Sequence, residues 1–402
     1  MRDVSVIGVG MTHFGKHMDR SMKDLCAEAV GITLEDAGIA KEDIQLAAAA
    51  NSAWGAIEGQ VSIRGQVVLR NIGIGGMPVI NVENACASGS TAFHVVWSQI
   101  ASGLCDVGLA LGFEKLHHPE KEKVMMGFLG GTDMEQSMKM IQEYIEKQGF
   151  PSNPRTIFMD IYAREARKHM EKYGTTQQDF AVISAKNHHH STMNPHAQYQ
   201  KDYTVDEVLA DKEVVFPLTR AMCSPMSDGA AAAILCSSEY AEKLGAEKPV
   251  KVLASLLTSG ADLGKGYEHI ARRLSRTAYE VAGVGPEDVD VAEVHDATAY
   301  AELAAYEHLG WCEYGGGGEL ASSGATALGG KLPTNTSGGL ESKGHPVGAT
   351  GLGQITEVVW QLRGRCGARQ VEGARVGMVH NGGGAIEPEE AAMCITILQS
   401  GE

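Results

Sequence analysis

Short apolar runs alternate with longer amphipathic segments along most of the chain. Residues 4–9 predict a strand, and residues 21–37 place their apolar side chains on one face of a predicted helix that ends at Gly38. The runs 107–112 and 230–236 are rich in small apolar residues, which is typical of buried strands. This alternation predicts an α/β fold in which helices cover a mainly parallel or mixed sheet.

A second set of strands and helices begins near Val250. It comprises a helix over 270–282, a strand over 290–296 that delivers His295, a glycine-rich loop at 315–318, a helix over 352–362, the glycine-rich segment 376–384 and a last strand over 391–398. In both halves a strand leads through a turn of small residues into a helix that carries a reactive side chain. This shared plan predicts an internal duplication, with one half over residues 1–250 and the other over residues 251–402.

Residues 115–215 differ from the rest of the chain in being charged and rich in methionine. They include a predicted helix over 157–173 and return to strands near Val214, so they predict a loop domain inserted into the first half. The run His188-His189-His190 stands at the end of a helix within this segment. Three consecutive histidines cannot all face one ion, so we predict a solvated surface here rather than a metal site.

Composition and charge narrow the range of functions. The chain has 402 residues, 44% of them hydrophobic and 21% charged, which is typical of a soluble globular protein. The formal net charge of −16 disfavours binding to nucleic acid or to an anionic membrane surface. No run of about twenty apolar residues predicts a membrane span, and the N-terminus does not resemble a signal peptide.

The eight cysteines are scattered singly along the chain. No C-x-x-C pair occurs, so the sequence predicts neither a zinc ribbon nor a disulfide scaffold, and no metal site. This usage suits a reducing cytoplasm.

Cys86 lies where an apolar run over 78–82 gives way to a predicted helix over 93–103. A thiol in the first turn of a helix feels the positive end of the helix dipole, which predicts a lowered pKa and a nucleophilic thiolate. The surrounding small residues leave room for an acyl group. The alternative interpretation is a buried structural cysteine.

Three histidines and a glycine-rich segment complete the candidate chemistry. We expect His345, framed by Gly344 and Pro346, to activate Cys86 as a base. We expect His295 to join His345 in donating to a thioester oxygen, directly or through a water molecule. We expect Gly382-Gly383-Gly384 to form a turn whose backbone amides approach a second oxyanion, because any Cβ there would clash. The amides of Gly382 and Cys86 are the predicted donors.

The motifs that carry these residues resemble those of the thiolases over essentially the whole chain. They are Asn84-x-Cys86-x-Ser88-Gly89, Ser227-Asp228-Gly229-Ala230-Ala231, His295-Asp296, Gly344-His345-Pro346-x-Gly348-Ala349-Thr350-Gly351 and His380-Asn381-Gly382-Gly383-Gly384. Within that superfamily the chain is similar to the branch of sterol-carrier-protein-2 thiolase and the archaeal acetyl-CoA acetyltransferases. The resemblance implies the thiolase fold, a duplicated five-layered αβαβα arrangement with an inserted loop domain, usually as a homodimer or a dimer of dimers.

Two departures from the common thiolase pattern stand out. His380 occupies the place of a second catalytic cysteine, and His295 occupies the place of an asparagine, as in the sterol-carrier-protein-2 branch. We expect His380 to act directly as acid and base; if it is only structural, His295 or His345 must move that proton. Ser224 falls where a thiolase loop serine usually touches coenzyme A.

The resemblance implies a thiolase that cleaves a 3-oxoacyl-CoA with coenzyme A, or performs the reverse condensation, through a Cys86 acyl-enzyme. Coenzyme A is then a substrate, and no tightly bound cofactor is expected. Acetoacetyl-CoA and branched or aromatic 3-oxoacyl-CoAs such as benzoylsuccinyl-CoA remain open as substrates. The alternatives are a retro-aldolase of the same fold and a non-catalytic carrier of acyl-CoA or lipid. The resemblance also implies a small zinc-ribbon/OB-fold protein as a partner.

Overall fold

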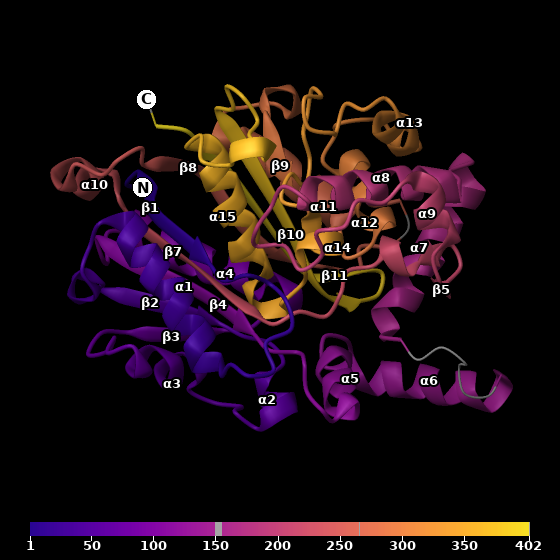
Figure 1. The fold of residues 1–402 in the computed structure, drawn as a ribbon, viewed down its shortest axis with the longest axis horizontal. Coiled ribbons are helices and arrows are strands. Elements are labelled where there is room, and N and C mark those ends of the chain that lie inside the picture. Colours follow the sequence, from indigo (N-terminus) through magenta and orange to yellow (C-terminus); the bar gives the residue numbers. More distant parts are fainter. Residues whose placement is uncertain (149–154, 265, 402) are drawn as a thin grey trace.

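The computed structural model describes residues 1–148, 155–264 and 266–401, so residues 149–154 of the predicted insertion lie outside the described residues. The central element is a nine-stranded mixed sheet in the order β3-β2-β4-β7-β1-β8-β11-β10-β9 (Figure 1). Its strands are β1 (Val4–Met11), β2 (Leu46–Ala50), β3 (Val79–Val82), β4 (Val107–Glu114), β7 (Gly229–Ser237), β8 (Val250–Ser259), β9 (Val291–Glu293), β10 (Val376–Ile386) and β11 (Glu389–Gln399). A small hairpin pairs β5 (Glu213–Val215) with β6 (Leu218–Thr219).

The same strand plan occurs twice in the sheet. In the first half β2 runs parallel to β4, which pairs antiparallel with β7, and β7 pairs antiparallel with β1. In the second half β9 runs parallel to β10, which pairs antiparallel with β11, and β11 pairs antiparallel with β8. The halves meet where β1 pairs with β8 through Ser5–Lys251 and Val6–Val250. The predicted duplication is therefore visible in the topology.

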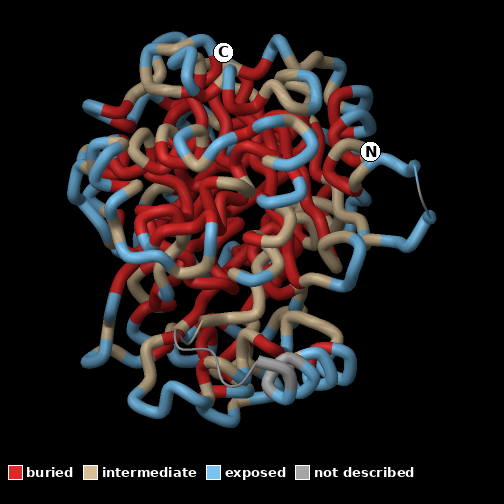
Figure 2. The backbone as a smooth tube through the Cα atoms, turned by 90° about the vertical axis from the view of Figure 1, so that its right-hand side faces the viewer, coloured by how far each residue is buried: buried red, intermediate tan, exposed pale blue. Residues whose placement is uncertain are grey.

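Helices form layers on both faces of each half of the sheet. Helices α4 (Ser88–Ala101) and α15 (Thr350–Leu362) share one core with the inner faces of both halves. Helices α1 (Met22–Ala37) and α3 (Arg64–Asn71) cover the outer face of the first half. Helices α11 (Ile270–Ala282) and α12 (Ala299–His308) cover the outer face of the second. Helices and sheet halves thus alternate in the five layers that the resemblance implies, and the buried residues gather at the centre (Figure 2).

The chain between β4 and β7 is mainly helical; its first helix packs against the helix Trp54–Glu58 of the first half, and its later helices lie beside the second half of the sheet (Figure 1). Its helices are α5 (Lys121–Leu129), α6 (Met134–Gln148), α7 (Ile157–Tyr173), α8 (Gln177–Ser191) and α9 (Val205–Ala210). The remaining helices are α2 (Trp54–Glu58), α10 (Ser238–Leu244), α13 (Gly317–Ser322) and α14 (Gly339–Lys343). Within the described residues, no helix combines the length and the apolar composition that crossing a membrane requires.

The predicted solvated surface of the three histidines is wrong for two of them. His188 and His190 at the end of α8 are buried, and only His189 is exposed, where it pairs with Asp202. A nitrogen of His188 lies 3.0 Å from the carbonyl of Ala221, and one of His190 lies 3.0 Å from the carbonyl of Asn335. These histidines join α8 to neighbouring loops, a use that sequence spacing does not reveal.

Candidate active site

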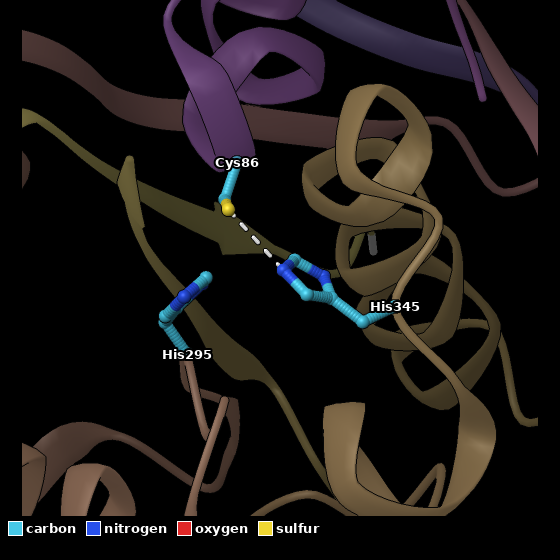
Figure 3. A group of neighbouring side chains, drawn as sticks. All are labelled: Cys86, His295 and His345. Atoms are coloured by element: carbon cyan, nitrogen blue, oxygen red, sulfur yellow. Dashed lines mark hydrogen bonds between the residues drawn. The ribbon is translucent and has the colours of Figure 1, made fainter. Parts of the chain in front are cut away.

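Cys86 lies in a short 3-10 turn, Ala85–Ala87, between β3 and α4. Ala85 adopts a left-handed backbone with φ of 46°, which few residues other than glycine adopt. The Ser88 hydroxyl donates to the Ala85 carbonyl at 2.6 Å and accepts from the Asn84 amide at 2.9 Å. These contacts fix the turn so that the Cys86 thiol points toward two histidines (Figure 3).

The expected lowering of the Cys86 pKa is wrong. Burial, reinforced by the nearby Glu114 carboxylate, raises the pKa of the thiol to about 12. Glu114 is fully buried and accepts hydrogen bonds from the Ser52 amide at 3.0 Å and the Gly348 amide at 3.2 Å. The thiol of the free protein is therefore protonated, and a nucleophile forms only when a base removes its proton.

His345 is the base that the geometry offers to Cys86. Its Nε2 lies 3.2 Å from the Cys86 sulfur, and its Nδ1 lies 2.7 Å from the Thr350 hydroxyl. That hydroxyl donates its only proton to the Pro346 carbonyl at 3.1 Å, so it must accept from Nδ1. Burial lowers the pKa of His345 to about 4. His345 is thus a neutral imidazole whose Nε2 lone pair faces the thiol.

His295 has the opposite tautomer. The side-chain amide of Asn381 donates to His295 Nδ1 at 3.1 Å, while its carbonyl oxygen accepts from the Ser90 hydroxyl at 2.9 Å. The His295 proton therefore resides on Nε2. Burial, and then the neighbouring His345, lower the pKa of His295 to about 3. A neutral hydrogen-bond donor thus lies beside the Cys86–His345 pair (Figure 3).

His380 lies in β10, next to this group. Its Nδ1 accepts the backbone amide of His295 at 3.4 Å, which leaves the proton on Nε2. Nε2 is buried and has no hydrogen-bond partner among the described residues. Burial, and then His295, lower the pKa of His380 to about 3, so its imidazole is neutral.

The three glycines after Asn381 belong to strand β10 and not to the predicted turn. A Cβ on Gly383 would lie 2.1 Å from the Asn84 carbonyl oxygen and 2.5 Å from the Ala87 nitrogen, so the strand packs flat against the Cys86 turn. Gly382 pairs with Met393, whereas Gly384, with φ of 65°, falls outside the strand register. The Gly384 amide donates toward the Cys86 sulfur.

These residues surround a cavity of about 520 Å³. Cys86, His295, His345, Gly382 and Ser224 all line it. Ser224 is half-buried, and its backbone amide donates to the Ala297 carbonyl at 3.0 Å. The structure thus gathers the predicted residues around one space, apart from His380, which lines an adjacent chamber.

The donor atoms of Cys86, His295 and His345 lie within 4.8 Å of one another. A thiolate and two imidazoles are ligands that Zn²⁺ prefers. Zinc bound there would occupy both the sulfur and the nitrogen that faces it, so a resident metal and a nucleophilic Cys86 exclude each other.

Four positioning residues of this site escaped sequence analysis as individual residues. Thr350 and Asn381 set the two tautomers, Ser227 accepts the His345 amide at 2.9 Å, and Glu114 raises the Cys86 pKa. Thr350, Asn381 and Ser227 belong to the motifs quoted above, so their place in a motif could have indicated a role in the site. No motif contains Glu114, and its role depends on its burial at the end of β4, which the sequence does not reveal.

Comparison with known proteins decides the family. Residues 4–214 match the family profile "Thiolase, N-terminal domain", and residues 261–397 match "Thiolase C-terminal domain-like". The chain belongs to the thiolase family. It is 41% identical to sterol carrier protein 2 of Homo sapiens over 95% of this chain and 70% of that protein. It is 39% identical to an acetyl-CoA acetyltransferase of Methanothermobacter thermautotrophicus, over 96% of this chain and 97% of that one.

A solved structure shares the fold of this thiolase at lower identity. The Ltp2-ChsH2(DUF35) aldolase has a TM-score of 0.79 and 23% identity, over 98% of this chain and 97% of that one. Membership of the thiolase family makes the protein an acyltransferase. The predicted family and fold are confirmed.

Proposed function

We propose that this thiolase cleaves a 3-oxoacyl-CoA with coenzyme A, or forms one in reverse, through an acyl-enzyme on Cys86. The observation that carries the proposal is the 3.2 Å contact between the Cys86 sulfur and an unprotonated Nε2 of His345. A thiol with a raised pKa needs a base in direct contact, and His345 supplies it.

In the degradative direction Cys86 attacks the C3 carbonyl while its proton passes to His345. The His295 Nε2–H donates, directly or through a water molecule, to the thioester oxygen, which becomes negatively charged as the enolate forms. The bond between C2 and C3 breaks, and the enolate of acetyl-CoA or another acyl-CoA leaves. We assign to His380 the transfer of a proton to C2, while the proton released from Cys86 passes from His345 to His380, so both imidazoles are neutral again once the acyl-enzyme has formed.

Coenzyme A then takes the acyl group from Cys86. Its thiol loses a proton to His345 and attacks the thioester carbonyl, and Cys86 leaves as the thiol. Backbone amides of Cys86 and the glycines of β10 are the donors we assign to this second oxyanion, with Gly384 added to the predicted Gly382. Ser224, at the wall of the cavity, is the residue we assign to contact with coenzyme A. No tightly bound cofactor is required.

An acyl-enzyme experiment tests the proposal. Intact-protein mass spectrometry after addition of acetoacetyl-CoA should show an acetyl adduct on the peptide that holds Cys86. Cys86→Ala should lose the adduct and several orders of magnitude in turnover, while Cys312→Ala, outside this cavity, should retain both. A retro-aldolase or a carrier requires no acyl adduct, so the absence of an adduct on Cys86 of the folded wild-type protein from every 3-oxoacyl-CoA tried, acetoacetyl-CoA included, contradicts the proposal.

We also propose a cytoplasmic homodimer that works with a small zinc-ribbon/OB-fold protein. The support is the similarity of fold to a complex with a DUF35 component, together with the strongly acidic chain. Co-purification from the native host, with light scattering and a zinc assay, should find this partner. The complex should bind coenzyme A more tightly than the chain alone. Full activity and unchanged affinity of the zinc-free chain alone would contradict a functional need for it.

A further inference from the structure

A second chamber of about 260 Å³ adjoins the cavity that holds Cys86. Helices α7 and α12 face each other across it, and the β10–β11 hairpin completes the wall. From α12 it receives Ala301, Ala304 and Ala305, whose helical spacing puts them on one face. Three alanines in place of larger residues keep the chamber open.

The chamber and the cavity share part of their walls, including His295, Gly382 and Gly384. A different hollow beside Cys86, lined by Ala85 and Val347 among others, has a volume of only about 20 Å³. That space is about the size of one methyl group or water molecule. The cavity of about 520 Å³ that Cys86 itself lines also holds Ser224, which we assign to contact with coenzyme A. The chamber that adjoins it is therefore the space we assign to an acyl group larger than acetyl.

The volume of the chamber suits a ring. Benzene fills an apolar protein cavity of about 150 Å³, so 260 Å³ accommodates a six-membered ring together with a substituent. Phe158, Tyr162 and Tyr300 present aromatic surfaces against which such a ring can pack.

Acidic side chains dominate the charge of the lining, and its cations are paired. Arg164 forms ion pairs with Glu165 and Glu387 near the exposed side. His269 pairs with Glu390 at 3.0 Å. Among the described lining residues, these ion pairs leave no cation without a carboxylate. A carboxylate on the acyl group would meet repulsion there.

Neutral hydrogen-bonding groups, in contrast, remain available in the chamber. Within the described part of the chain, the hydroxyls of Tyr162 and Tyr300 form no hydrogen bond. Both side chains are half-buried, and both line the chamber. A ligand group in the chamber can therefore hydrogen-bond to either hydroxyl without displacing a protein partner.

We propose that the chamber binds the acyl part of the substrate and selects a ring-sized group that carries a neutral hydrogen-bonding substituent, such as a hydroxyl. The proposal rests on the acyl transfer through Cys86 described above and names its substrate class. Acetyl and carboxylate-bearing acyl groups are the disfavoured classes.

A matched series of substrates tests this selection. The series is acetoacetyl-CoA, 3-oxo-3-phenylpropanoyl-CoA, and the para-hydroxyl and para-carboxyl derivatives of the phenyl compound. We expect kcat/KM to be highest for the hydroxyl derivative, about three- to tenfold above the phenyl compound, as one additional hydrogen bond provides. The carboxyl derivative should fall below the phenyl compound by at least tenfold.

Two variants connect the selection to the chamber. Tyr300→Phe should reduce the ratio of kcat/KM between the hydroxyl and phenyl substrates by about three- to tenfold, and Tyr240→Phe on α10, outside the chamber, should not change it. Ala304→Leu should reduce the ratio between the phenyl substrate and acetoacetyl-CoA by at least tenfold.

The outcomes separate the inference from the proposed function. Equal kcat/KM along the series, or preference for the carboxyl derivative, with Cys86 still acylated, overturns the inference alone. Unchanged ratios in both chamber variants overturn it as well. Failure of every substrate to acylate Cys86 overturns the proposed function instead.

Discussion

Two imidazoles close to one thiol differ in which nitrogen carries the proton. The Nδ1–H of His345 donates a hydrogen bond to the Thr350 hydroxyl, whereas the Asn381 amide donates one to Nδ1 of His295. Because burial lowers the pKa of both rings, each stays neutral near pH 7. The ring centroids of His295 and His345 lie 5.4 Å apart, so a base and a hydrogen-bond donor stand side by side. Neither tautomer requires a charged partner.

His380 presents an Nε2 proton without a partner among the described residues, which is the basis for a test of its role. His380→Ala should still allow acylation of Cys86, because His345 is unchanged. It should suppress proton exchange at C2 of the donor acyl-CoA and lower turnover by about 10²–10⁴-fold, the usual loss for an acid–base residue. Exchange measured by NMR in deuterated buffer checks this.

His189→Ala is the control for that substitution, because His189 is exposed on α8 and pairs with Asp202. It should leave exchange unchanged. Exchange at the wild-type rate in His380→Ala would make His380 structural and transfer the proton to His295 or His345.

At the scale of single residues, sequence reasoning found the groups but not their electrostatics. Cys86 and His345 were recognisable from the small residues and turns around them, and they do lie in contact. The pKa of Cys86 was predicted in the wrong direction, since the helix dipole is local, whereas the burial that mainly raises this pKa, and the Glu114 carboxylate that adds to it, arise from tertiary packing. Gly384 was overlooked because its departure from the strand register is a tertiary property.

Among the elements, amphipathic helices were the easiest to predict. The bounds of α7 and α11 agree with the predicted 157–173 and 270–282, because apolar periodicity marks these helices from end to end. The strand predicted over 290–296 stops earlier, as β9. The Val294 amide donates to the Asn335 side chain at 2.9 Å, so the chain leaves the sheet there. No local sequence pattern predicts such a contact between distant residues.

The flat packing of β10 on the Cys86 turn leads to a prediction about Gly383. In Gly383→Ala the new Cβ meets backbone atoms of Asn84 and Ala87, which cannot rotate away. The turn must shift, which should cost about 1–3 kcal/mol of stability. Acylation of Cys86 should slow by at least about tenfold, because small displacements of reacting groups are costly. Denaturant unfolding measures the loss of stability, and rapid-quench assays measure the rate of acylation.

Gly31→Ala provides the matched control within α1. Its added Cβ meets nothing within 4 Å, so the variant should gain about 0.5–1 kcal/mol from helix propensity and keep normal acylation. Equal behaviour of the two variants would contradict the importance of the close contact at Gly383.

For the whole molecule, buried neutral histidines couple stability to pH. His380 has a pKa of about 3 in the folded chain, well below that of an exposed histidine. Between about pH 6.5 and that value the unfolded chain binds a proton that the folded chain does not, so stability falls as pH falls. Glu114, whose pKa rises to about 7, acts in the opposite direction above about pH 4.5.

Comparison of slopes isolates the contribution of His380. Plotted against pH between 4 and 6, the unfolding free energy of the wild type should have a slope about 1.4 kcal/mol per pH unit steeper than that of His380→Gln. Denaturant titrations at several pH values provide both slopes, and Glu114 contributes equally to each. Parallel slopes would show that His380 is already protonated or exposed in the folded protein.

The repeated topology also has a consequence for the origin of the catalytic pair. A 3-10 turn, Ala85–Ala87, leads directly into α4, and another, Val347–Ala349, leads directly into α15. Cys86 belongs to the first turn, and His345 stands just before the second. An ancestor built from two identical copies would have presented the same turn twice across its symmetry axis. Fusion of such copies would have freed the two turns to diverge, one supplying the nucleophile and its counterpart the base.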